Sequence, residues 1–170
     1  MQKITSAYAN KLIRSFEEEK SFWLTKESES STYVVSVGED PVIPEYDYAE
    51  VAEKIAELDE KIAIIKHALN VFNSQARIQV GDTEMSVDTI LIRMAQLNRR
   101  KVVLDGMRKQ LPKVRVDSGF YGRNANPEYR HINYDLELVK KDFDEISKAI
   151  ADMQIALDHF NQTELFDVDI

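Results

Sequence analysis

The sequence contains no cysteine, and this absence excludes several classes of chemistry. Without thiols the chain has no disulfide framework, no thiolate zinc site and no cysteine nucleophile. Such a chain is compatible with a reducing compartment, so we predict a cytoplasmic protein. Long hydrophobic runs are missing as well: the longest aliphatic run is residues 62–65, and the first thirty residues contain no apolar core of a signal peptide. We therefore expect neither a secretory signal nor a membrane span.

Positive charge is scarce overall, and the formal net charge is −8. This balance argues against a general nucleic-acid binder, because such proteins neutralise phosphates with lysine and arginine. The bases are nevertheless concentrated: residues 93–115 hold eight bases and one acid, whereas residues 45–72 hold seven acids and three lysines, and residues 134–164 hold eight acids and three lysines. One basic element therefore lies between two acidic ones.

Known catalytic and phosphate-binding motifs are absent. The sequence has no Gly-x-Ser-x-Gly elbow, P-loop, dinucleotide fingerprint or His-Glu-x-x-His. One Glu-x-x-His pair, Glu128 and His131, has the spacing found in di-iron helical bundles, but those sites need two such pairs on facing helices and two further glutamates. We predict no metal and no cofactor, and an enzyme is the weaker interpretation.

The length of 170 residues suits a single domain that buries a core of its own. Apolar residues at helical spacing predict a first amphipathic helix over residues 4–26. The β-branched stretch at residues 32–37 predicts a short strand, which ends before a linker that contains Pro41 and Pro44. Residues 1–45 thus form an N-terminal helix, a strand and a linker.

A second helix begins after Asp47, a candidate N-cap with Glu50 three residues later. Its apolar residues recur at alternating steps of four and three, which is a heptad seam and predicts a left-handed supercoil around a partner helix. The seam residues are Val51, Ile55, Leu58, Ile62, Ile65, Leu69 and Phe72.

The last helix has the same rhythm. Its seam residues are Leu136, Val139, Phe143, Ile146, Ile150, Met153, Leu157 and Phe160. Because the two seams match, we predict that they pack on each other along antiparallel helices. A third helix lies between them, from a cap at Ser86 to Leu111 before Pro112, and Lys101 and Arg108 fall on its apolar stripe. We expect these two bases to reach the solvent edge or to pair with glutamates of the flanking helices.

Two irregular segments interrupt the helices. Residues 76–85 contain two short β-like runs around Gly81 and Asp82, which predicts a small hairpin that reverses the chain. Residues 113–132 contain two possible strands around a longer loop with Pro127, which predicts a second hairpin or a functional loop.

The region of the first hairpin carries a family resemblance. Asn70, Asn73, Gly81, Arg93 and Arg100 stand where the septicolysin-like family of small uncharacterised bacterial proteins has an Asn-x-x-Asn pair, a glycine turn and an arginine-rich helix. The end of the chain is similar too, with Asn161, Thr163 and Leu165 in register, although Gln162 replaces an expected aromatic residue. The resemblance covers residues 46–167 and implies a helical, oligomeric protein without an established activity.

The sequence therefore predicts a mainly α protein, a long antiparallel coiled-coil helical bundle with short β-hairpins at the helix ends. Our first functional hypothesis is a cytoplasmic structural or interaction protein that forms a homo-oligomer, because thin bundles leave apolar stripes uncovered.

Two alternatives stay open. A nucleic-acid or anionic-ligand module would combine cations and aromatic rings of the third helix and the 113–132 loop. Its residues are Arg99, Arg100, Lys101, Lys113, Arg115, Arg123, Tyr129, Arg130 and His131. An orphan enzyme would use an inter-subunit cleft lined by Asn70, Asn73, Arg93 and Asn161.

Overall fold

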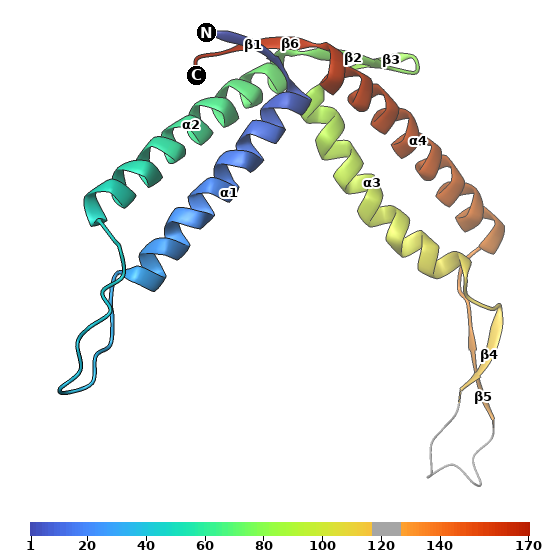
Figure 1. Cartoon of the computed structure of the whole chain (residues 1–170). Coiled ribbons are helices and arrows are strands. Elements are labelled where there is room, and N and C mark those ends of the chain that lie inside the picture. The colour runs from blue at the N-terminus through green and yellow to red at the C-terminus, as the bar shows by residue number, and fades with distance from the viewer. Residues whose placement is uncertain (117–126) are drawn as a thin grey trace. The chain divides into compact units, whose positions relative to one another are not determined.

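A computed structural model of the chain describes residues 1–116 and 127–170, and these residues form four helices and six short strands (Figure 1). The helices are α1 (Ser6–Ser30), α2 (Tyr48–Gln75), α3 (Val87–Arg108) and α4 (Leu136–Thr163). The strands are β1 (Gln2–Thr5), β2 (Arg77–Val80), β3 (Thr83–Ser86), β4 (Lys113–Val116), β5 (Glu128–His131) and β6 (Leu165–Val168). The predicted mainly α fold with short β-hairpins is confirmed, while the left-handed supercoil stays a prediction.

The chain divides into two compact units. Unit 1 comprises Met1–Ile78 and Leu157–Ile170, and unit 2 comprises Gln79–Ala156. Unit 1 therefore contains both ends of the chain, and unit 2 is the continuous middle. The prediction of one domain over residues 1–170 stays a prediction.

Unit 1 is built on the antiparallel pair of α1 and α2, which lie side by side (Figure 1). Each helix begins at a polar cap: the Thr5 hydroxyl accepts from the Tyr8 amide at 3.2 Å, and the Asp47 carboxylate accepts from the amides of Ala49 and Glu50 at 2.8 and 3.3 Å. The predicted cap at Asp47 is confirmed. The core of this unit consists of Ile4, Ala9, Ile13, Ile62, Ile65, Phe166 and Val168.

The predicted packing of the α2 seam along the α4 seam is not confirmed, although Phe72 and Phe160 of the two seams stack at one end. The seam of α2 faces α1, and its members Val51, Leu58 and Ile65 are buried there. A heptad repeat states that a helix needs a partner along one stripe, but it does not state which helix supplies it. The connection of residues 31–47 joins α1 directly to α2, so α1 becomes the partner of α2.

The pairing of β1 with β6 was not predicted from the sequence. The two strands run antiparallel, with Ile4 opposite Phe166, and both side chains are buried. Phe72 of α2 stacks on Phe160 and Phe166, with ring centroids 5.2 and 4.9 Å apart. The first and last segments of the chain thus close one end of the α1 and α2 pair.

The predicted strand at residues 32–37 is also wrong, because residues 31–47 contain neither strand nor helix. A β-branched sequence favours extended backbone, but a strand also needs a neighbour that pairs with its amides and carbonyls. The segment has one turn bond, from the Glu39 amide to the Ser36 carbonyl at 3.1 Å, and the Tyr46 hydroxyl donates to Glu27 at 3.3 Å.

The hairpin predicted at residues 76–85 is confirmed as β2 and β3. Gly81 has φ +57°, a left-handed conformation that glycine adopts at low cost. The Ser86 hydroxyl then caps α3 by accepting from the Thr89 amide at 3.4 Å. The segment is therefore a chain reversal that also supplies the cap of the next helix.

In unit 2, α3 lies beside α4 (Figure 1) and ends at Arg108, three residues before the predicted Leu111. Lys101 and Arg108 are half-buried against α4 and lie over the ring of Phe143, at 5.5 and 3.9 Å from its centroid. Of the two predicted arrangements, Arg108 keeps partial contact with solvent, with 37% of its side chain exposed, and its guanidinium bonds Asp105 of its own helix at 2.8 Å in place of a glutamate of a flanking helix.

The second predicted hairpin is confirmed by β4 and β5, which pair antiparallel with Lys113 opposite His131 and Arg115 opposite Tyr129. At its foot the Tyr134 hydroxyl donates to the Met107 carbonyl at 2.7 Å and ties the chain leaving the hairpin to the end of α3.

Candidate interaction surfaces

One face of the β4 and β5 hairpin combines cations with an aromatic ring. Residues directly opposite each other in an antiparallel pair project to the same side, so Lys113, Arg115, Tyr129 and His131 share one face. All four are exposed, and the Lys113 ammonium lies 4.2 Å from the centroid of the Tyr129 ring. We call these four residues the basic ribbon face. The other face carries Val114, Val116, Glu128 and Arg130.

The ribbon meets a shallow pocket at its foot. The pocket has a volume of about 350 Å³, and Arg130, His131, Asn133 and Tyr134 supply its polar lining together with Gln110. Three of the predicted contact residues, Tyr129, Arg130 and His131, therefore lie on or beside one small structure. Arg123 lies outside the described residues.

The basic residues of α3 do not form one surface with each other. Lys101 faces α4, while Arg99 and Arg100 are exposed. Arg93 is exposed and places a guanidinium nitrogen 3.2 Å from the Met85 sulfur. The clustering of bases along the sequence therefore does not translate into a single basic face of the helix.

The electrostatics at the end of α3 is local. Hydrogen bonds from the Lys109 ammonium and the Arg108 guanidinium hold the pKa of the Asp105 carboxyl below its usual value, although some loss of hydration opposes this. Two of the bases near the hairpin thus share the single negative charge of Asp105, and one positive charge remains.

The outer side of α3 carries apolar residues that the sequence analysis did not single out. Leu91, Ile92, Val102 and Val103 are 48%, 58%, 74% and 51% exposed. We call the side of α3 that carries these four residues the outer face of α3. The signal was available in the sequence, since α3 has more apolar residues than one stripe uses.

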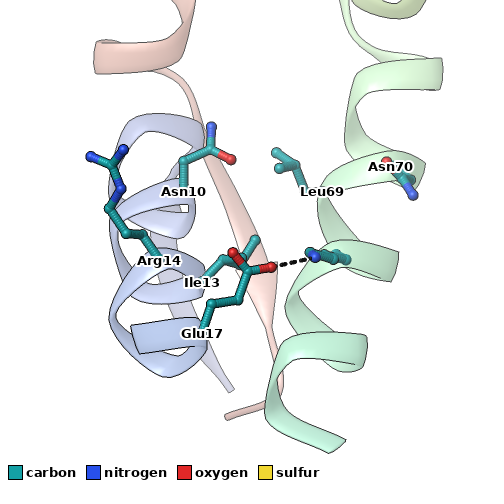
Figure 2. A pocket seen from close by; sticks show the side chains of 7 residues that line it. Asn10, Ile13, Arg14, Glu17, Leu69 and Asn70 are labelled. Atoms are coloured by element: carbon teal, nitrogen blue, oxygen red, sulfur yellow. Dashed lines mark hydrogen bonds and ion pairs between the residues drawn. The ribbon is translucent and has the colours of Figure 1, made fainter. Parts of the chain in front are cut away.

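A second pocket lies between α1 and α2 in unit 1, with a volume of about 460 Å³ (Figure 2). Asn10, Arg14 and Asn70 contribute polar groups, and Ile13 and Leu69 form its apolar floor. Its strongest charges neutralise each other, because Lys66 and Glu17 form an ion pair at 2.7 Å across the helices. With Arg14 the lining keeps a formal charge of +1 beside its amide groups.

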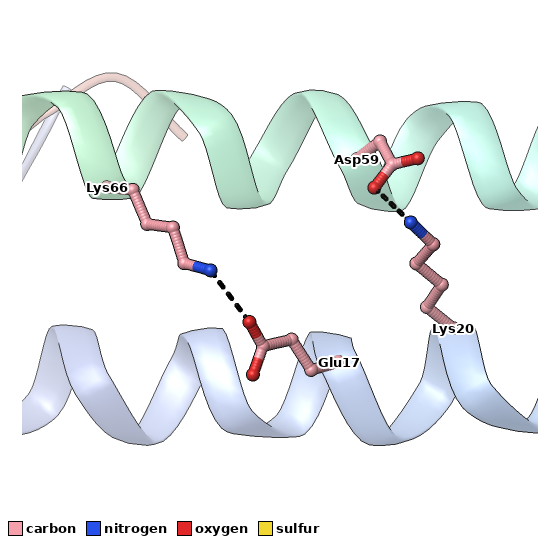
Figure 3. A network of polar contacts seen from close by, with 4 residues as sticks. All are labelled: Glu17, Lys20, Asp59 and Lys66. Atoms are coloured by element: carbon pink, nitrogen blue, oxygen red, sulfur yellow. Dashed lines mark hydrogen bonds and ion pairs between the residues drawn. The ribbon is translucent and has the colours of Figure 1, made fainter.

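A similar bridge further along the same helix pair joins Lys20 to Asp59 at 2.6 Å (Figure 3). Both bridges cross from α1 to α2, one beside the pocket and one beyond it.

The four residues of the predicted enzyme cleft are not all in one unit. Asn70, Asn73 and Asn161 belong to unit 1, and Arg93 belongs to unit 2. Asn70 is exposed, while Asn73 and Asn161 are half-buried, and the buried Asn73 side-chain oxygen has no hydrogen-bond partner. The orphan-enzyme hypothesis stays a prediction.

The described residues contain no group of histidines and acids that would hold a metal ion. Glu128 and His131 lie on β5, where a spacing of three residues sends their side chains to opposite faces. The same part of the chain has no helix long and apolar enough to cross a membrane.

The comparison with solved structures gives one informative likeness. The chain is similar to the crystal structure of a functionally unknown conserved protein from Corynebacterium diphtheriae, with a TM-score of 0.69 and 15% sequence identity over 98% of this chain and 100% of that chain. No protein-family model and no curated protein matches the sequence. At this identity the likeness shows that the two proteins share a fold.

Proposed function

We propose that this chain is a structural or interaction protein that assembles with copies of itself. The observation that carries the proposal is its accessible surface, 12726 Å² for 19.6 kDa. A compact monomer of this mass exposes about 8,600 Å², and two separate compact domains of half the mass expose about 10,300 Å² together. The chain therefore exposes roughly 4,100 Å² more than the first expectation and roughly 2,400 Å² more than the second.

Much of this surface is apolar. Large hydrophobic residues are exposed on α3, on α4 and in the segment that connects α1 to α2. Examples are Val102, Ile155 and Val34, which are 74%, 69% and 100% exposed. Each unit contains only two helices over most of its length, and two helices bury one stripe each and leave their outer sides uncovered. Obligate homodimers bury roughly 2,000–5,000 Å² in total, which is enough to cover such an excess on two chains.

The charges of the two units also favour association between copies over binding of a strongly charged polymer. Unit 1 carries eighteen acids and nine bases, whereas unit 2 carries twelve acids and thirteen bases. Facing surfaces of different charge reduce repulsion between copies of an acidic protein. The lack of cysteine is compatible with a cytoplasmic location, and the resemblance to the septicolysin-like family would agree with an oligomer.

The test is the mass of the native assembly in solution. Light scattering coupled to size-exclusion chromatography at micromolar concentration should give a mass of two or more times 19.6 kDa. A monodisperse monomer at that concentration would overturn the proposal. Native mass spectrometry of the same sample would identify any molecule that copurifies and so separate self-assembly from binding of another partner.

A second candidate function rests on the basic ribbon face. Two or three cations beside an exposed tyrosine ring, with no acid on the same side of the described strands, are the groups that bind single-stranded nucleic acid by phosphate contacts and stacking. The test is binding of a labelled single-stranded RNA at low salt. Arg115→Ala should weaken binding and flatten its salt dependence, Tyr129→Ala should weaken binding at every salt concentration, and Lys148→Ala on α4 is the control. No binding by the natural chain at low salt would remove this candidate.

A further inference from the structure

Helix α3 is apolar on two sides. Ile90 and Leu104 are fully buried on the side toward α4, whereas Leu91, Val102 and Val103 remain about half to three-quarters exposed. Successive residues of a helix are turned by about 100°, so positions 91, 95 and 102 and positions 92, 99 and 103 lie away from the buried stripe. Arg99 lies among these outer positions, so the outer face of α3 is an exposed apolar patch that contains a cation.

The same side of α3 is open at Gly106, in the last turn of the helix. A methyl group added there would meet no atom of the described residues within 4 Å. Another chain therefore has room to approach this side of the helix closely.

The segment of residues 32–47, which we call the arm, matches the outer face of α3 in chemistry. It contains neither helix nor strand, and its apolar residues Val34, Val37 and Val42 are between 91% and 107% exposed. Its charged residues are all acidic, namely Glu39, Asp40, Glu45 and Asp47. An exposed connection this long and this apolar is typical of a binding segment.

The charges on the two surfaces are complementary. Between Leu91 and Gly106 the outer face of α3 carries Arg99, has Arg100 at its margin, and has no acid. The arm has acids and no base. Contact between them would pair acids with arginines around a centre of valine, leucine and isoleucine side chains, the usual anatomy of a protein interface.

We propose that the arm of one copy lies across the outer face of α3 of a second copy. This inference rests on the proposed self-assembly and names the surfaces that produce it. Two copies related by a two-fold axis would exchange both arms. Each arm would then lie on the α3 helix of the other copy, and the pair would be a closed dimer with no arm and no α3 left over. The contact covers the apolar residues of both surfaces at once.

The absence of cysteine makes crosslinking a clean test. One set of chains carries Val34→Cys, Val37→Cys or Val42→Cys in the arm, and a second set carries Val102→Cys or Val103→Cys in α3. Mixed pairs treated with a short bis-maleimide should give at least one covalent dimer, about tenfold above each variant alone. The control is the same arm variants mixed with Ala151→Cys, an exposed position on α4. Absence of every mixed crosslink would overturn the proposal.

A double variant, Val37→Cys with Val103→Cys, separates exchange between copies from a contact within one chain. If only this variant crosslinks, and its product has the mass of a single chain, the arm meets α3 of its own chain and the proposal fails. If the mixed single variants crosslink, the contact is between copies.

Native mass then distinguishes this inference from the proposed function. Val102→Glu should weaken association at least tenfold, whereas Ala151→Glu, which adds the same charge on α4, should leave it unchanged. A natural chain that is monomeric ends both proposals. An oligomer that neither crosslinks through the arm nor responds to Val102→Glu keeps the proposed function and ends the inference about the arm.

Discussion

The two helix pairs of this protein are held together by different means. Between α1 and α2 the core is mainly apolar, with Ala9 and Ile65 fully buried, and the charges form bridges at the margin from Glu17 to Lys66 and from Lys20 to Asp59. Between α3 and α4 two cations reach into the centre and lie over Phe143. In that unit the pairs of Arg108 and Lys109 with Asp105, of Lys140 with Glu137, of Lys141 with Glu145 and of Lys148 with Asp152 all join residues three or four positions apart.

The difference shows how a basic residue on an apolar stripe is accommodated. Placing a cation against a carboxylate in an interior removes two charges from water, whereas an aromatic face attracts the cation without a second charge. Arg108 does both, since it stacks on Phe143 and bonds Asp105 at the helix surface. We expect the stability of the α1 and α2 pair to depend on apolar packing. The stability of the α3 and α4 pair should depend more on the Phe143 ring.

The largest effect should come from the apolar centre of the first pair. Ile65→Ala should lower the free energy of unfolding by about 3 kcal/mol, because it removes a fully buried side chain and leaves a cavity. Urea denaturation at a fixed protein concentration measures this change. Val71→Ala, at a position 40% exposed on the same helix, is the control and should change it by about 0.5 kcal/mol. Equal effects would contradict the assignment of the core.

Phe143→Leu tests the α3 and α4 pair and should lower the free energy of unfolding by about 1 to 2 kcal/mol. Leucine keeps apolar volume on α4 but removes the ring face from Lys101 and Arg108, and each such contact contributes about 0.5–1 kcal/mol. Phe22→Leu, at a ring 61% exposed on α1, is the matched control. If the two substitutions lower the free energy of unfolding equally, the Phe143 ring has no special role in holding α3 and α4 together.

The bridges across the first pair should contribute less. A double-mutant cycle on Lys20→Ala and Asp59→Ala should give a coupling energy of about 0.5 kcal/mol, since both side chains keep substantial contact with water. The coupling should fall toward zero at about 1 M salt, where screening acts over roughly 3 Å. A coupling that survives high salt would show that the bridge is less hydrated than its exposure indicates.

The smallest effect concerns Asp105 and depends on pH. Because its pKa is lowered in the folded chain, its ionised form stabilises the fold above the ordinary carboxyl pKa, and that contribution disappears as the pH falls through the lowered value. Asp105→Asn should therefore be slightly less stable than the natural chain at neutral pH. The two chains should converge under strongly acidic conditions, and thermal unfolding followed by circular dichroism across that range measures the difference. A gap that persists in strong acid would show that the effect of Asn is not electrostatic.

Local features were predictable from the sequence because they depend on neighbours within a few residues. The caps at Asp47 and Ser86 and the glycine turn at Gly81 follow from hydrogen bonds and φ angles of the adjacent backbone. The predicted strand at 32–37 failed for the converse reason, since a strand exists only with a partner. Of the predicted contact residues, Tyr129, Arg130 and His131 lie together, but Arg93, Arg99 and Lys101 point different ways along one helix.

The sequence by itself determined the helices, their caps, the turns and the existence of an apolar stripe on each long helix, because periodicity and backbone chemistry act locally. Only the tertiary structure decided that α1 rather than α4 covers the seam of α2, that the first and last strands pair, and that Phe143 receives the cations of α3. Apolar stripes attract any complementary stripe without direction, so the choice among partners belongs to chain connectivity and packing.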